Sequence, residues 1–162
     1  MEPVDPKELR RMKIFAELTD EQLARLAGWV EPVQFPPNRV IVHIGAHGDC
    51  MYLILSGEVL VSVPEDKRDI ALTQLETGDF FGDVCLFDEG PRSADVVAKT
   101  ECRLIKLSKT NFETMLNEDP AMAARILVAT IRHVESRVRR LTNRYVDSML
   151  LSRSWNALLP RK

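Results

Sequence analysis

The sequence has few cysteines and no long apolar run. Its 162 residues include only Cys50, Cys85 and Cys102, far apart and without a Cys-x-x-Cys pair. This spacing argues against a disulfide framework, a zinc site or an iron–sulfur cluster, so we expect buried thiols. No run of about 18 apolar residues occurs, and the N-terminal MEPVDPKELRR lacks the apolar stretch of a signal peptide. We therefore expect no membrane span, no export and a cytoplasmic location.

Signatures of catalysis are also missing. We find no Ser/His/Asp or Cys/His arrangement that the predicted fold would bring together, no P-loop and no dinucleotide fingerprint. His43 and His47 have the spacing of a metal-binding pair on a helix, but they fall across a strand end and a glycine turn. We predict that the protein is not an enzyme and that it holds neither a metal nor a cofactor.

The charge is unevenly distributed along the chain. From Ala121 onward nine Lys and Arg residues stand against two acids, so this part carries +7 and the preceding 120 residues carry −9 of the total of −2. A basic run of this kind is usually a solvated face, and we do not expect it to bind nucleic acid. The apolar content of 45% is enough for the core of one domain.

Helix signals open the chain. Asp5-Pro6-Lys7-Glu8 reads as an N-cap, a proline at the first helical position and an acid at the third, which predicts a short helix through about Met12. Thr19 to Gln22 repeats the capping-box pattern and predicts a second helix that ends near Gly28.

A period of two replaces the helical pattern between Val33 and Leu107. Short apolar runs alternate with glycine and proline turns, and no strand-helix alternation appears. The runs are RVIVHI, MYLIL, EVLVSV, DIALTQL, DVVAK and CRLIKL. We predict a mainly β fold with flanking helices, an antiparallel β-roll of the double-stranded β-helix or jelly-roll type.

Two further helices are predicted after the strands. Ser108 caps the first, and the second runs from about Ala121 to Ser148. We therefore divide the chain into residues 1–120, the N-terminal helices and roll; 121–148, a long lid or dimerisation helix; and 149–162, an apolar and basic tail. The tail's apolar residues need a cover on their own domain, on a sister subunit or on an output protein; they are Met149, Leu150, Leu151, Trp155, Leu158 and Leu159.

A heptad stripe follows the long predicted helix. Its members recur at intervals of four and three residues, as in a coiled-coil seam; they are Leu127, Ile131, Val134, Val138, Leu141 and Tyr145. We expect Leu127 and Ile131 to pack on the chain's own strands, because an apolar helix face is usually core. We expect the stretch from Val138 to Tyr145 to meet the same helix of a second subunit, which makes a homodimer.

The segment FFGDVCLFDEGPRSADV, residues 80–96, contains the binding chemistry. Gly82 allows close backbone approach, and a short helical turn in GDVCLF would aim free N–H groups at an anion. Arg92 supplies a planar fork for phosphate oxygens, and Ser93 adds donors beside it. Asp83 suits a hydroxyl, because an ionised carboxylate only accepts hydrogen bonds. Phosphate and sugar hydroxyl together indicate a nucleotide.

This segment resembles the phosphate-binding cassette of cyclic nucleotide-binding domains, and the order FAELTDEQLARLA, strands, MYLILSGEV, cassette and long helix is similar to that family from about Phe15 to Tyr145. The resemblance implies an eight-stranded β-roll and a cyclic purine nucleotide as ligand, cAMP or cGMP. It implies that Arg92 holds the cyclic phosphate and Asp83 the ribose 2′-OH. The complete predicted ligand-binding set is Gly82, Asp83, Val84, Cys85, Leu86, Arg92, Ser93 and Ala94.

Two positions depart from the family pattern. Asp83 replaces the usual glutamate and is one methylene shorter. Where the catabolite-activator branch has a threonine-serine pair that reaches the adenine, this chain has Arg137 and Val138. The candidate purine contacts are Thr130, His133, Ser136 and Arg137.

We predict a stand-alone cyclic-nucleotide sensor that signals to a partner in trans. Ligand binding would repack Leu86 and Phe87 and move the long helix. We expect no helix-turn-helix module behind that helix, because residues 149–162 are too few for one. A module of the same fold that binds no nucleotide, or one that binds a cyclic dinucleotide, is the alternative. The residues leave open the choice among cAMP, cGMP and cyclic dinucleotide, and the identity of the output partner.

Overall fold

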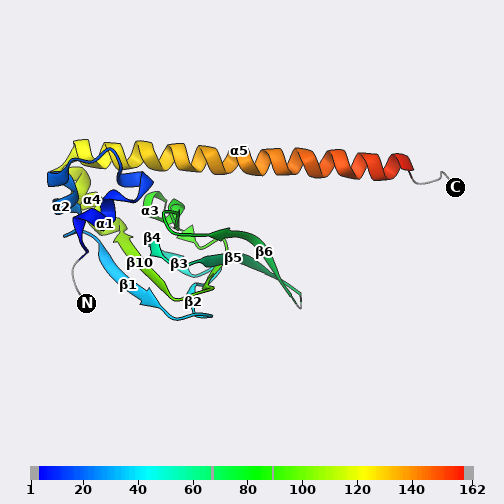
Figure 1. The fold of residues 1–162 in the computed structure, drawn as a ribbon, viewed down its shortest axis with the longest axis horizontal. Coiled ribbons are helices and arrows are strands. Elements are labelled where there is room, and N and C mark those ends of the chain that lie inside the picture. The colour runs from blue at the N-terminus through cyan, green and yellow to red at the C-terminus, as the bar shows by residue number, and fades with distance from the viewer. Residues whose placement is uncertain (1–3, 67, 89, 159–162) are drawn as a thin grey trace.

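The structure is a computed structural model that describes residues 4–66, 68–88 and 90–158, with the side chains of all of these except 68 and 151–158. A body of antiparallel strands lies below one long helix, α5 (Pro120–Leu158), which extends well past the body (Figure 1). The shorter helices gather at the N-terminal end of α5. The predicted fold, a mainly β roll with flanking helices and a long C-terminal helix, is confirmed.

The N-terminal helices begin at the predicted caps. In α1 (Pro6–Arg10) the Asp5 carboxylate accepts a hydrogen bond from the Lys7 amide at 2.8 Å. A 3₁₀ turn, η1 (Lys13–Phe15), follows. In α2 (Asp20–Leu26) Thr19 and Gln22 form the reciprocal capping box. These caps satisfy amides that have no partner inside the helix, so the two helices start at defined residues.

Three antiparallel sheets form the roll. One has the order β1-β10-β4-β7, the second β2-β9-β5-β6, and the third pairs β3 with β8. Their bounds are β1 (Glu31–Phe35), β2 (Val40–Val42), β3 (His47–Gly48), β4 (Cys50–Ser56), β5 (Val59–Glu65), β6 (Arg68–Leu75), β7 (Phe80–Phe81), β8 (Gly90–Pro91), β9 (Asp95–Ala98) and β10 (Cys102–Ser108). Each run of alternating residues in the sequence overlaps one strand, and these strands are β2, β4, β5, β6, β9 and β10.

Two very short strands fix the ends of the segment 80–96. Strand β7 pairs with β4, with Phe80 opposite Leu53, and β8 pairs with β3, with Gly90 opposite Gly48. Between them lies α3 (Val84–Phe87), the short turn predicted in GDVCLF. The segment is therefore held to the roll at both ends, while its middle connects the two pairs.

The core has two parts. One lies between the N-terminal helices, the start of α5 and the sheet that contains β4, and it includes Phe15, Leu23 and Ile126. The other lies inside the roll and includes Ile54, Val59 and Leu104. Burial of the first part fixes the root of α5 on the body, because Ile126 is fully covered by the N-terminal helical layer.

Ser108 caps α4 (Lys109–Glu118) as predicted, accepting from the Asn111 amide at 3.1 Å. Helix α5 then continues to Leu158, ten residues past the end we expected at Ser148. No proline or glycine occurs between Ala121 and Leu158, so nothing in the local sequence stops the helix. The boundary between helix and tail at residue 148 is therefore not a boundary of secondary structure.

The heptad stripe of α5 is mostly uncovered. Leu127 packs at the edge of the core, as expected, but Ile131 is 64% exposed, and our expectation that it packs on the strands is wrong. The reason is geometric: at this turn α5 does not lie on a strand but borders an open cavity beside α3, and Ile131 lines that cavity. Val138, Leu141 and Tyr145 are also exposed.

Of the tail's apolar residues, Met149 and Leu150 are exposed. The side chains of 151, 155 and 158 and all of residue 159 lie outside the described residues.

Within the described part of the chain, no helix is both long enough and apolar enough to span a bilayer.

We expect Leu23→Ala to lower the free energy of unfolding by about 2–5 kcal/mol, because Leu23 is 1% exposed in the core at the root of α5. The matched control Leu116→Ala, at a leucine that is 38% exposed, should cost about 1 kcal/mol or less. Urea titration followed by circular dichroism measures both. Equal losses would show that the helical layer contributes little to stability.

Candidate functional site

Arg92 is the centre of the candidate site. Its side chain is only 7% exposed, and its backbone is fixed by two hydrogen bonds: its amide donates to the Ala46 carbonyl at 2.8 Å, and its carbonyl accepts from the Gly45 amide at 2.8 Å. The guanidinium Nη2 donates to the Cys50 Sγ at 3.2 Å. The Nη1 atom is buried and has no hydrogen-bond partner. A buried donor without a partner costs free energy unless a ligand accepts from it.

No carboxylate neutralises Arg92 among the described residues. Asp95, a possible ion-pair partner from the sequence, instead accepts from the Ile44 amide at 2.7 Å and lies 3.8 Å from His43. Asp88 is exposed and makes no ion pair with the described chain, and residue 89 lies outside the description. Burial raises the pKa of the Cys50 thiol, so Cys50 stays uncharged at neutral pH and accepts only as a neutral sulfur. Arg92 is therefore a buried cation without a counter-charge among the described residues.

Two glycines make room for the guanidinium. Gly82 has φ +77°, and a Cβ placed there would clash with Arg92 Nη1 and lie 2.9 Å from the Cys50 carbonyl oxygen. A Cβ at Gly48 would lie 2.7 Å from Arg92 Nε and would also meet the Cys85 sulfur. We predicted that Gly82 lets the backbone approach a ligand, whereas its missing side chain accommodates Arg92. The absence of a side chain at Gly82 thus leaves the space that the Arg92 guanidinium occupies.

Asp83 is the second buried charged residue of the cassette. Its carboxylate does not cap α3 but turns toward α5, where its Oδ1 accepts from Arg137 Nη1 at 3.3 Å. The other guanidinium nitrogen of Arg137 donates to the Phe80 carbonyl, and the guanidinium carbon lies 5.4 Å from the centre of the Phe80 ring. Asp83 thus joins the cassette to the long helix.

The remaining predicted cassette residues lie at different depths. Cys85, Leu86 and Ala94 are buried, so their side chains serve packing. Val84 is 67% exposed and Ser93 is exposed. The structure therefore places Gly82 beside the Arg92 guanidinium. Val84 instead lines the open cavity beside α3.

The four candidate purine contacts on α5 differ in their availability. Thr130 is buried, and its hydroxyl donates to the Ile126 carbonyl at 2.8 Å. His133 stacks on Phe80 at 4.3 Å between ring centres, and its Nε2 is buried without a partner. Burial lowers the pKa of His133, with a smaller contribution from Arg137, so the ring is neutral at pH 7. Ser136 is exposed. Arg137 is held by Asp83 and Phe80.

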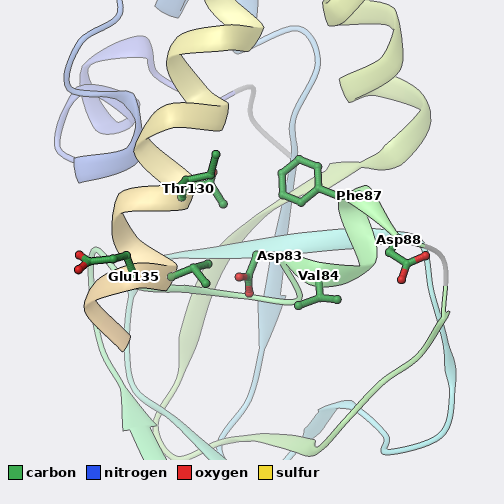
Figure 2. A pocket seen from close by; sticks show the side chains of 8 residues that line it. Asp83, Val84, Phe87, Asp88, Thr130 and Glu135 are labelled. Carbon is green, nitrogen blue, oxygen red and sulfur yellow. The ribbon is translucent and has the colours of Figure 1, made fainter. Parts of the chain in front are cut away.

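A cavity of about 420 Å³ opens between α3 and α5. Figure 2 shows Val84 and Phe87 on the cassette side, Thr130 and Glu135 on the α5 side, and Asp83 between them. Its other lining residues are Asp88, Ile131 and Val134. The lining contains three acids, no basic residue and several apolar side chains, so it is unsuited to a phosphate. Arg92 does not line this cavity.

No group of three or more His, Cys, Asp or Glu side chains in the described ranges could hold a metal ion. His43 and His47, which we considered as a metal pair, are both exposed.

Sequence reasoning missed three residues of the site: Cys50, Gly48 and Phe80. Cys50 and Gly48 lie more than 40 residues before Arg92 in sequence, and their roles depend on the β3–β8 and β4–β7 pairings. Phe80 looks like an ordinary core residue, and its ring is also the surface on which His133 and Arg137 rest. No local signal in the sequence indicates these contacts.

The comparisons agree with this geometry. The family model for the cyclic nucleotide-binding domain matches residues 32–119. The chain belongs to the cyclic nucleotide-binding domain family. The matched region contains the whole roll from β2 onward, the cassette with Gly82, Asp83 and Arg92, and helix α4.

Relatives of this domain occur in regulatory proteins. The chain is 29% identical over 140 residues to a CRP-like cAMP-activated global transcriptional regulator of Mycobacterium tuberculosis, covering 86% of this chain and 61% of that protein. It is 32% identical over 110 residues to a cAMP-dependent protein kinase regulatory subunit of Aspergillus fumigatus, covering 67% of this chain and 26% of that protein. The chain therefore spans less than two thirds of the length of these relatives.

A solved cyclic nucleotide-binding domain from Methylobacillus flagellatus KT superimposes with a TM-score of 0.79 at 23% identity, covering 88% of this chain and 80% of the other. This likeness shows that the fold is shared.

We expect Gly82→Ala to destabilise the protein more than Gly78→Ala. Both glycines have positive φ, which costs an alanine about 1–2 kcal/mol, but a Cβ at Gly78 meets nothing within 4 Å, whereas one at Gly82 clashes with Arg92. Gly78→Ala thus measures the backbone cost alone. Thermal unfolding of both variants gives the difference, and equal costs would mean that Arg92 does not occupy the space beside Gly82.

Proposed function

We propose that the protein binds a cyclic purine mononucleotide, cAMP or cGMP, in the cassette and acts as a stand-alone sensor. One observation supports the proposal: among the described residues, the buried Arg92 guanidinium has no counter-charge and its Nη1 has no hydrogen-bond partner. Burying a lone cation is costly, and a singly charged cyclic phosphodiester would neutralise it with charge-assisted hydrogen bonds. Membership of the family supports the choice of a cyclic nucleotide.

In this proposal each cassette residue has a defined part. Arg92 donates from Nη1 to a phosphate oxygen, and the exposed Ser93 adds a hydroxyl donor beside it. Asp83 accepts from the ribose 2′-OH. Backbone and packing at Gly82, Val84, Cys85, Leu86 and Ala94 shape the rest of the phosphate pocket. The purine lies toward α5, where Thr130, His133, Ser136 and Arg137 are the candidate contacts.

The output is a population shift in trans. Phosphate and ribose anchor the cassette, Leu86 and Phe87 repack, and α5 changes position. The cavity between α3 and α5 gives Phe87 room to move, because Phe87 is one of its lining residues and is half-exposed. We place residues 1–120 as the sensing unit, 121–148 as the moving helix and 149–162 as its extension. The signal passes in the cytoplasm to an output protein.

We also propose that the protein is a homodimer through α5. Ile131, Val138, Leu141 and Tyr145 follow heptad spacing and are all exposed in the single chain. A second copy of the helix would cover this stripe and would transmit a change in one subunit to the other.

The alternative, a module of this fold that binds no cyclic mononucleotide, rests on one observation: the carboxylate meant for the ribose is already paired with Arg137. Calorimetric titration with cAMP, cGMP and cyclic di-GMP separates the two. Binding of cAMP or cGMP supports the proposed sensor function, and binding of cyclic di-GMP alone supports a dinucleotide receptor. No binding of any of the three supports an interaction module.

We expect Arg92→Met to lose about 2–4 kcal/mol of binding free energy for the nucleotide while the ligand-free protein stays as stable as the wild type or becomes more stable. The substitution removes a buried cation without a partner and keeps an apolar stem in place. The control is Arg103→Met, at an arginine on β10 that pairs with Glu8 on the surface. Calorimetry and thermal unfolding measure the two effects. Unchanged affinity in the folded variant would refute the phosphate assignment.

We expect Val138→Asp to convert the dimer to a monomer, because it places a charge in the centre of the heptad stripe. Val146→Asp is the matched control: Val146 is exposed on the same helix and lies outside the stripe. Sedimentation velocity measures the mass of each variant. A wild-type mass equal to that of one chain would exclude the α5 dimer.

A further inference from the structure

The carboxylate of Asp83 has two oxygens with different surroundings. Oδ1 accepts from Arg137, while no described residue donates to Oδ2. We infer that Arg137 is a positioning residue: it holds the Asp83 carboxylate oriented through Oδ1 so that Oδ2 can accept a ligand hydroxyl, and it thereby couples ribose binding to the docking of α5. This inference rests on the proposed function.

Arg137 is held on three sides. Besides Asp83, it contacts the Phe80 backbone carbonyl and the face of the Phe80 ring. A guanidinium can meet all three because it is planar and presents donors in a fixed fork. Phe80 is itself buried and paired with Leu53 of the roll, so the guanidinium rests on a rigid support. An arginine fixed in this way limits the rotation of the Asp83 carboxylate.

The contact is also the outermost anchor of α5 on the body. Arg137 is partly buried, whereas every described side chain from residue 138 to residue 150 is exposed. His133, one turn earlier, rests on the same Phe80 ring. The root of α5 is secured by the apolar core around Ile126. Between the root and residue 137, Arg132 makes an exposed ion pair with Glu17 at 2.7 Å, and the partly buried contacts are those with Phe80 and Asp83.

Because Asp83 takes part in both ribose binding and the docking of α5, each of these two events affects the other. A hydroxyl bound to Oδ2 fixes the carboxylate further and strengthens its pair with Arg137, so ligand favours the docked helix. By linkage the docked helix must favour the ligand by the same factor. The shorter side chain of Asp83 fits this scheme, because a carboxylate close to its own backbone has less freedom and is more easily held by one partner.

The test compares cAMP with 2′-deoxy-cAMP, which lacks the hydroxyl. In Arg137→Gln we expect affinity for cAMP to fall by roughly tenfold, as for loss of a charge-assisted hydrogen bond, and affinity for 2′-deoxy-cAMP to fall by about threefold or less. Arg137→Lys should recover only part of the cAMP affinity, because an ammonium does not reproduce the fork. The matched control is Arg144→Gln, at an exposed arginine two turns further along that forms no ion pair with the described chain; both affinities should be unchanged.

A second readout needs no ligand. Hydrogen exchange of the α5 amides at residues 131–140 should rise in Arg137→Gln and in Asp83→Asn alike, while that at residues 121–130 should stay as in the wild type, because the core holds the root.

The outcomes separate the inference from the proposed function. Equal loss for both nucleotides, or tighter binding of cAMP in Arg137→Gln, overturns the inference and leaves the proposed function standing. Failure of the wild type to bind either nucleotide overturns the proposed function and the ribose role with it, and hydrogen exchange then decides the anchoring role of Arg137 alone. Unchanged exchange in both variants overturns that role.

Discussion

The candidate site depends on one guanidinium, that of Arg92, which is buried without a counter-charge in the described part of the chain. Several features that look unrelated in the sequence serve its placement: the missing side chains at Gly48 and Gly82, the neutral thiol of Cys50, and the backbone hydrogen bonds of Arg92 to the turn that precedes β3. A carboxylate in place of Cys50 would pair with the Arg92 guanidinium and neutralise its charge, so no anionic ligand would be needed. The thiol accepts one N–H and leaves the charge available.

Asp83 and Arg92 differ in their charge partners. No described residue compensates the charge of Arg92, whereas Asp83 is already paired with Arg137. A bound anion would therefore gain most at Arg92, where it would neutralise a buried charge. At Asp83 a ligand would add to an existing ion pair that joins the roll to the long helix. Under the proposed function, most of the affinity would thus come from Arg92 and the coupling to α5 from Asp83.

Local signals in the sequence predicted most of the fold. Asp5, Thr19 and Ser108 cap the helices as their patterns indicated, and each alternating run overlaps one strand. The cassette residues could be named because their chemistry is specific. What could not be predicted depends on distant contacts: two-residue strands have no periodicity, the sulfur beside Arg92 comes from another strand, and Arg137 turns inward to the cassette. The exposure of Ile131 follows from how little of α5 the body covers, which heptad spacing does not reveal.

From residue 138 to residue 150 the side chains of α5 are exposed, and exposed helical turns of this length are marginal in water on backbone propensity alone. In the proposed homodimer, association would stabilise these turns, and by mass action their helical content would rise with protein concentration. The far-ultraviolet circular dichroism signal of the helices should consequently weaken on dilution, so the helix content would depend on the concentration of the protein.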